Sequence, residues 1–237
     1  MNTLIHYSRR AALRLIAGAT AALAIPGQVW AFVVGQFRTR TIEDTSISFD
    51  ATTGTVRVGG KPQPYALIVD GMVQTPARLD YKALRSFPQH AQTSDFHCVE
   101  GWSVLDVQWS GIRPVDIIAL AQPRKEATHV IFHALGTTSG VGDLDHYIEC
   151  LPLEDLQNDK LQYLLALDYH GSPMPDERGA PLRLVCPFDL GYKGIKYLTR
   201  MEFTDTPRDG WWTVANDIYP RHAPVQPERL RKPDPRS

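Results

Sequence analysis

The 237-residue sequence has few cysteines and no surplus of charge of either sign. Its three cysteines, Cys98, Cys150 and Cys186, are too few for a disulfide framework, and none forms the Cys-x-x-Cys pattern of haem attachment or iron–sulfur ligation. A formal net charge of −1 gives no basic surplus, so we expect no nucleic-acid partner. The glycine patterns of P-loops and dinucleotide-binding folds are also absent. Cys150 and Cys186 either pair with each other or stay buried and inert, and we expect the second.

The first 31 residues have the pattern of an export signal. Arg9 and Arg10 precede an apolar run over residues 15–25, and the small-x-small pattern before Phe32 suits cleavage after Ala31. The run is shorter than the ~20 residues of a spanning helix. The paired arginines favour the twin-arginine route, which exports folded proteins, over ordinary export, so we expect a periplasmic protein. Because the segment holds three Arg and no acid, its loss changes the net charge to −1 − 3 = −4.

The remaining chain is long enough for one sizeable domain. Residues 32–60 are polar and rich in threonine, which predicts an extended, loosely packed segment. Residues 61–219 carry the apolar patterns of a single domain. Residues 220–237 are rich in Pro and Arg and lack periodicity, so we expect a tail that wraps the surface or frays.

Strand patterns outnumber helix patterns, which predicts a mixed, strand-rich α+β fold. An Asp-Gly pair at residues 70–71 predicts a hairpin turn. The predicted helices cover residues 81–86 (capped by Asp80), 112–121 and 152–156. The predicted strands cover residues 46–49, 55–58, 65–69, 91–99, 128–134, 145–151, 161–169, 182–186 and 195–203.

The stretch from Asp95 to Ser103 places Cys98 between His97 and Glu100, with Trp102 close by. A cysteine in such a setting is either a small buried hydrophobe or a soft metal ligand. A second stretch, residues 173–200, combines glycines with Arg183, Lys193 and Lys196. Such a pattern suits either an anion cradle or a solvated basic strand.

Four motifs together resemble the molybdopterin-binding domain of the sulfite oxidase family. They occur in the family order, between about residues 65 and 205. They are Phe96-His97-Cys98-Val99-Glu100-Gly101-Trp102-Ser103 with Trp109-Ser110-Gly111, then Leu151-Pro152-Leu153-Glu154-Asp155-Leu156, the strand from Gly179 to Val185, and Gly191-Tyr192-Lys193-Gly194-Ile195-Lys196-Tyr197.

The resemblance implies a sulfite oxidase-type fold and a molybdenum centre held by one molybdopterin and one protein thiolate. Cys98 stands at the position of this thiolate, with His97 beside it, and Tyr147 stands where sulfite oxidases carry an active-site tyrosine. A soft thiolate suits a redox-active metal. The residues that the resemblance places at the cofactor are Arg178, Arg183, Tyr192, Lys193, Gly194 and Lys196.

The resemblance leaves the substrate open between two directions. One is reduction of an S- or N-oxide, including oxidised methionine in proteins, and the other is oxidation of a sulfite-like anion. The sequence offers no counterpart of the sulfite-binding arginine, which favours reduction. We expect a monomer that exchanges electrons with a separate carrier, such as a cytochrome or a membrane haem subunit. The alternative is a non-catalytic cofactor- or partner-binding module on the same scaffold.

His129 and His133 have the spacing that puts two side chains on one side of a strand. Two such histidines suggest a zinc pair, but no third ligand stands at a helpful spacing in the sequence. We therefore expect a structural pair.

Overall fold

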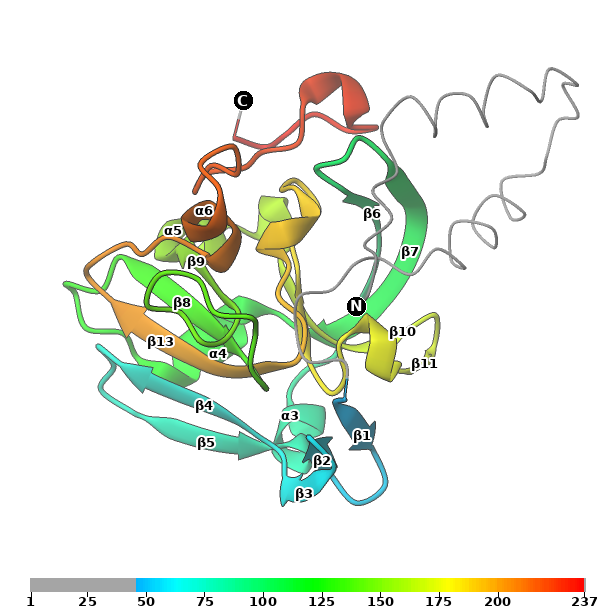
Figure 1. Cartoon of the computed structure of the whole chain (residues 1–237), viewed down its shortest axis with the longest axis vertical. Helices are drawn as coiled ribbons and strands as arrows, with labels where there is room; N and C mark the ends of the chain where they lie inside the picture. The colour runs from blue at the N-terminus through cyan, green and yellow to red at the C-terminus, as the bar shows by residue number, and fades with distance from the viewer. Residues whose placement is uncertain (1–45, 237) are drawn as a thin grey trace, which may run out of the picture. The chain divides into compact units, whose positions relative to one another are not determined.

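The computed structural model describes residues 46–236 (Figure 1). The predicted signal peptide at residues 1–31 lies outside this range, as does the first part of the predicted extended segment. The strands are β1 (Ser48–Asp50), β2 (Thr55–Val58), β3 (Lys61–Pro64), β4 (Ala66–Gly71), β5 (Ala77–Asp80), β6 (His90–His97), β7 (Ser103–Ile112), β8 (His129–Ala134), β9 (Ile148–Pro152), β10 (Leu164–Tyr169), β11 (Ser172–Pro173), β12 (Arg183–Val185) and β13 (Leu198–Thr204).

Helices are short and few in the same range. The α-helices are α3 (Tyr81–Ser86), α4 (Pro114–Ala121), α5 (Leu153–Gln157) and α6 (Trp211–Ala215). One-turn 3₁₀ helices are η1 (Asp159–Leu161), η2 (Asp176–Arg178), η3 (Gly191–Lys193) and η4 (Pro227–Arg229). The prediction of a strand-rich α+β fold is confirmed. The Asp80 carboxylate accepts a hydrogen bond from the Ala83 N–H, and so caps α3 as the sequence predicts.

Two five-stranded sheets carry most of the described fold (Figure 1). One has the order β5-β4-β13-β8-β9, in which only β4 and β13 run parallel. The other contains β11-β10-β7-β6, with β12 paired to β10. A three-stranded meander, β1-β2-β3, precedes them. The chain crosses from the second sheet to the first between β12 and β13, and η3 lies in this crossing.

The strand β7 is absent from the sequence prediction. Its centre alternates as a half-buried strand should, because Val107 and Trp109 are buried and Gln108 is exposed. The alternation fails earlier, where Leu105 is exposed and Asp106 has a positive φ of 56°. Because β7 extends to Ile112, the predicted helix over residues 112–121 begins two residues later, at Pro114.

The hairpin predicted at Asp70-Gly71 exists, but its turn lies elsewhere. Both residues belong to β4, which pairs with β5 from Val69 opposite Ala77 to Ala66 opposite Asp80. The connection therefore runs through residues 72–76. Gly71 is required for another reason: a Cβ there would lie 2.2 Å from the Phe203 carbonyl oxygen of β13.

The segment before residue 61 packs more tightly than its composition predicts. Ile47 and Val56 are buried members of the main hydrophobic core. The β2–β3 hairpin also spans residue 60, where the sequence predicts the end of the extended segment. Among residues 46–236, no helix is long and apolar enough to cross a membrane.

Gly111 tests the close packing of β7 on β10. A Cβ at this position would lie 2.1 Å from the Leu165 carbonyl oxygen. We expect Gly111→Ala to lower the free energy of unfolding by about 1–3 kcal/mol, because the backbone must move to admit the methyl group. Urea unfolding followed by tryptophan fluorescence measures this loss. The exposed neighbour Gln108 provides the control, since Gln108→Ala should change stability by under about 0.5 kcal/mol. A Gly111→Ala variant as stable as the wild type would contradict the described packing.

Candidate active site

Cys98 lies in a closed turn between β6 and β7. Its N–H donates to the Trp102 carbonyl at 2.9 Å, and the Gly101 N–H donates back to the Cys98 carbonyl at 3.1 Å. The side chain is half-buried, whereas Cys150 and Cys186 are buried and unpaired. Burial raises the pKa of all three thiols, and most strongly that of Cys186. Cys98 is therefore the most exposed of the three thiols.

His97 fixes the base of this turn. Its side chain is buried, and Nδ1 forms a 2.8 Å hydrogen bond with the Ser103 hydroxyl across the β6–β7 pair. Burial lowers the pKa of His97, which favours the neutral imidazole. Its backbone also pairs with Leu190, immediately before η3. His97 thus joins the cysteine turn to the β12–β13 crossing.

A small cleft, with about 10 Å³ of enclosed space, lies between the end of β6 and this crossing. Arg183 of β12 lies at the cleft, and its guanidinium stacks over the Trp109 ring at 5.1 Å and the Phe96 ring at 5.9 Å. Its Nη1 donates to the Arg178 carbonyl at 2.9 Å. The cleft is lined by Asp95, Phe96, Trp109, Arg183, Leu184, Val185, Cys186, Gly191 and Gly194.

Two glycines allow the crossing to approach β6 and β12 closely. A Cβ on Gly191 would lie 2.2 Å from the Phe96 ring, so no other residue fits at that position. A Cβ on Gly194 would lie 2.9 Å from the Leu184 carbonyl oxygen and 3.8 Å from the Arg183 guanidinium. Gly194 therefore lies where the sequence predicts it, beside the arginine.

Lys196 packs against Gly179, the residue that follows Arg178. Gly179, with a φ of +109°, packs directly on the Lys196 side chain, which is 2.7 Å from the position of a Cβ. The Tyr197 N–H donates to the Gly179 carbonyl at 3.1 Å. The Arg178 guanidinium stacks over the Tyr169 ring at 5.5 Å. These contacts place Arg178, Arg183, Gly194 and Lys196 in one region of the fold.

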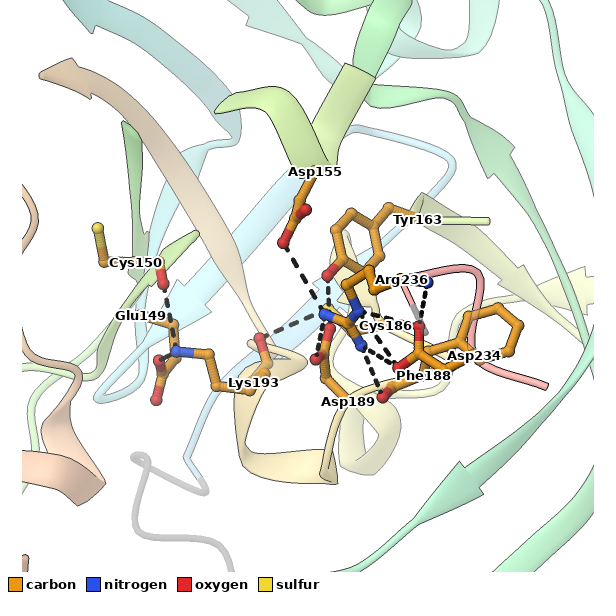
Figure 2. Close-up of polar contacts among 10 residues, drawn as sticks. All are labelled: Glu149, Cys150, Asp155, Tyr163, Cys186, Phe188, Asp189, Lys193, Asp234 and Arg236. Carbon is orange, nitrogen blue, oxygen red and sulfur yellow. Dashed lines mark hydrogen bonds and ion pairs between the residues drawn. The ribbon is translucent and has the colours of Figure 1, made fainter. Parts of the chain in front are cut away.

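Lys193 lies on the other side of η3, facing the interior (Figure 2). Its side chain is 1% exposed, and Nζ contacts the Glu149 carboxylate at 2.5 Å and the Cys150 carbonyl at 3.2 Å. Burial raises the pKa of Glu149, and Lys193 opposes that rise. The sequence predicts a cofactor role for the Lys193 charge, but the structure uses that charge to neutralise Glu149. A cofactor role for Lys193 stays a prediction.

Tyr147 and Tyr192 also belong to this inner side. The Tyr147 hydroxyl donates to the Tyr192 carbonyl, and the Tyr192 hydroxyl donates to the Pro220 carbonyl at 2.7 Å. Both side chains are buried. The predicted contact of Tyr147 with the metal or substrate stays a prediction, because its hydroxyl has a protein partner here.

Asp189 anchors the start of η3, and sequence reasoning missed it. Its carboxylate accepts hydrogen bonds from the Tyr163 hydroxyl at 2.5 Å and from Arg236 at 2.9 Å (Figure 2). Arg229 is a second missed residue, since its guanidinium donates to the Cys98 and Trp102 carbonyls. Both arginines come from the tail that composition describes as frayed or wrapped. Its alternation of Arg with Asp and Glu is the one sequence signal of these contacts.

The comparisons with known proteins identify the family of the chain. A family model described as "Oxidoreductase molybdopterin binding domain" matches residues 53–212. The chain belongs to this family. The predictions of a molybdopterin cofactor and of an oxidoreductase are thereby confirmed, and the oxidoreductase takes the place of the non-catalytic module.

Two relatives share about a third of their aligned residues with the chain. The protein-methionine-sulfoxide reductase catalytic subunit MsrP of Gluconobacter oxydans is 35% identical over 177 residues, which are 70% of this chain and 56% of that protein. The uncharacterized oxidoreductase YuiH of Bacillus subtilis is 36% identical over 165 residues, 69% of this chain and 77% of that protein. The match thus spans little more than half of the MsrP relative.

A solved structure shares the fold. The sulfane dehydrogenase SoxCD from Paracoccus pantotrophus matches 61% of this chain and 39% of its own chain, with a TM-score of 0.53 and 20% identity. At this identity the likeness concerns the fold alone. It confirms the prediction of a sulfite oxidase-type architecture.

The side chains at the cleft fit the cofactor of the family. A half-buried thiol suits a soft metal, and a guanidinium held in an aromatic cradle suits a phosphate. In the cofactor-loaded protein, Cys98 would hold the metal as a thiolate. Arg183, together with Arg178 and Lys196, would hold the anionic part of the pterin. Among residues 46–236, no group of three or more His, Cys, Asp or Glu side chains is arranged to hold a metal ion.

The buried Lys193–Glu149 pair yields a stability prediction. We expect Lys193→Met to lower the free energy of unfolding by about 3–5 kcal/mol, because it leaves a carboxylate buried without its counter-charge. The double variant Lys193→Met with Glu149→Leu should regain most of that loss. Chemical denaturation of the three proteins measures both changes. A single variant with wild-type stability would show that the pair does not anchor η3.

The buried His133 makes the stability of the fold depend on pH. Its ring contacts His146 at 2.9 Å and Glu202 at 3.0 Å, and Arg200 donates to the same Glu202 carboxylate at 3.0 Å. Burial and Arg200 lower the pKa of His133 to about 4. Between pH 6.5 and pH 4, His133 is therefore protonated in the unfolded chain but stays neutral in the folded chain. The free energy of unfolding consequently falls as the pH drops from 6.5 towards 4.

We therefore expect the wild type to lose more stability than His133→Gln between pH 7 and pH 5, by roughly 1–2 kcal/mol. Urea unfolding at the two pH values gives the four free energies that are needed. Equal losses in the two proteins would exclude this role for His133.

Proposed function

We propose that this chain is the catalytic part of a periplasmic reductase that removes oxygen from an S-oxide, with methionine sulfoxide as the substrate class. The observation that carries the proposal is the half-buried Cys98, two residues beyond Phe96 of the cleft that holds Arg183, in a chain 35% identical to a relative named as a methionine-sulfoxide reductase catalytic subunit. The twin-arginine pattern at residues 1–31 supports the location.

Molybdenum bound to a pterin supplies two-electron chemistry in which an oxygen atom is transferred. The overall change consumes two electrons and two protons, and converts the S-oxide to a sulfide and water. The protein would hold Cys98 as a thiolate ligand and leave the metal open to the substrate. Although the pKa of Cys98 is raised in the free protein, a bound metal would favour the thiolate and displace the thiol proton.

The residues around the cleft position the reactants. His97, neutral and tied to Ser103, keeps the cysteine turn in place. Arg183 is held rigid by Trp109 and Phe96, so it can bind a phosphate with little loss of side-chain entropy. Tyr147 is a candidate to hydrogen-bond the substrate if its hydroxyl leaves the Tyr192 carbonyl.

The electrons come from a separate protein in this proposal. The chain carries no haem or iron–sulfur cysteine pattern of its own. The name of the MsrP relative calls it a catalytic subunit, which supports a partner subunit for this chain as well. A cytochrome or a membrane haem subunit is the kind of carrier that we propose, acting on a monomeric catalytic chain.

Cys98→Ser tests the ligand and the function together. We expect the wild type, produced with the complete cofactor pathway, to hold about one molybdenum and one pterin per chain, since the family binds a single molybdopterin. Cys98→Ser should lose turnover and change the visible spectrum. Cys150→Ala is the matched control, because Cys150 is buried away from the cleft and should retain both.

Substrate tests then separate the two directions. Oxidation of a reduced viologen dye by methionine sulfoxide supports the proposal, and an N-oxide is the first comparison substrate. Rapid sulfite-dependent reduction of a cytochrome, with no S-oxide reduction, would reverse the proposed direction. A well-folded protein free of molybdenum and pterin would refute the function altogether.

A further inference from the structure

The C-terminal segment, residues 220–236, touches the site at two separate places. It lies outside residues 53–212, which the family model matches, so membership of the family gives this segment no role. Its backbone pairs with the crossing loop: the Leu190 N–H donates to the Ala223 carbonyl at 2.8 Å, and the Val225 N–H donates to the Phe188 carbonyl at 2.9 Å. Ala223 and Val225 are buried. The segment is therefore part of the packed domain.

The first contact is with the cysteine turn. The Arg229 Nη2 group donates to the Cys98 carbonyl at 2.9 Å and to the Trp102 carbonyl at 3.0 Å, and lies 3.3 Å from the Ser103 hydroxyl. These acceptors stand on both arms of the turn. One guanidinium therefore closes the turn from outside, with charge-assisted bonds that are stronger than neutral ones.

Neighbouring contacts fix the Arg229 side chain itself. Its Nη1 donates to the Gln226 side chain at 3.1 Å, within the turn of η4. Two residues later, Arg231 contacts Asp95 of β6 and Asp106 of β7, each at 2.5 Å. The segment is thus pinned to both strands that carry the cysteine turn.

The second contact is with the loop that carries η3 (Figure 2). Arg236 donates to the Asp189 carboxylate at 2.9 Å and to the Phe188 carbonyl at 3.0 Å. Asp189 is 3% exposed and also accepts from Tyr163, so its charge is neutralised by Arg236. The same segment therefore holds the cysteine turn at one end and the cofactor loop at the other.

We propose that residues 220–236 complete the active site, with Arg229 as the positioning residue of the Cys98 turn. This inference rests on the proposed role of Cys98 as the metal ligand. Arg229 sets where the sulfur lies, because it holds the carbonyls at both ends of the turn. A lysine cannot replace it, since a single ammonium on a flexible stem lacks the planar fork that bonds these carbonyls and Gln226 together.

The first test uses the protein without its cofactor. In Arg229→Gln we expect the amides of Cys98 and Gly101 to exchange hydrogen about tenfold faster or more, because the variant removes charge-assisted hydrogen bonds that hold both arms of the turn. Exchange in β8 and β13 should not change. Lys232→Gln, which removes a neighbouring exposed charge, is the matched control and should exchange like the wild type.

The second test uses the cofactor-loaded protein. Arg229→Gln and Arg229→Lys should keep molybdenum at the wild-type ratio but show an altered paramagnetic resonance signal, with turnover lowered about 10- to 100-fold. Lys232→Gln should keep the wild-type signal and rate. A merely structural role would change stability and leave the signal as it is.

The outcomes separate this inference from the proposed function. Unchanged exchange in Arg229→Gln, or an unchanged resonance signal in both Arg229 variants, overturns the positioning role. If Arg229→Gln fails to fold, Arg229→Lys keeps the charge and decides by the same two measurements. A wild type that binds no molybdenum refutes the proposed function, while the exchange measurement still tests whether Arg229 holds the turn.

Discussion

The loop between β12 and β13 depends on charges that are buried on its inner side. Asp189 pairs with Arg236 before η3, and Lys193 pairs with Glu149 at its end. The outer side of the same loop must carry glycine, because Gly191 and Gly194 touch Phe96 and β12 without room for a side chain. Because glycines leave the outer face of this loop without side chains, the two ion pairs hold its inner face. Loss of one partner from either pair would leave a buried charge without its counter-charge.

This division explains the two characters of the cleft. Its inner end is rigid and cationic, because Arg183 is clamped between aromatic rings and tied to the Arg178 carbonyl. Beyond its outer end lies Cys98, the one half-buried thiol among the three cysteines, on a turn closed by hydrogen bonds. A redox cofactor needs a cationic anchor for its anionic part deep in the protein and a metal near the surface, since the substrate must reach the metal alone.

The sequence predicts those parts of the site that lie within short motifs. Cys98, Arg183 and Gly194 are singled out because each lies in a short motif of the family, although their contacts, such as that of Arg183 with Phe96, join distant stretches of the chain. Lys193 has the right position but another partner, because Glu149 lies 44 residues away in the chain. The contact of Arg229 with Cys98 spans 131 residues, and no local pattern announces it. Strand β7 is missed for a related reason, as exposed Leu105 interrupts an alternation that only the pairing with β6 and β10 restores.

The wide separation of these parts bears on the order of assembly. The thiol, the arginine of β12, the η3 loop and the C-terminal segment come together only through contacts between distant stretches of the chain. The contact of Arg229 with Cys98 joins residues 131 positions apart, so the turn around Cys98 is closed only once these distant stretches have folded together. The site is therefore a property of the folded domain and not of one local segment. The predicted twin-arginine signal at residues 1–31 is consistent with this, because that route exports proteins that are already folded.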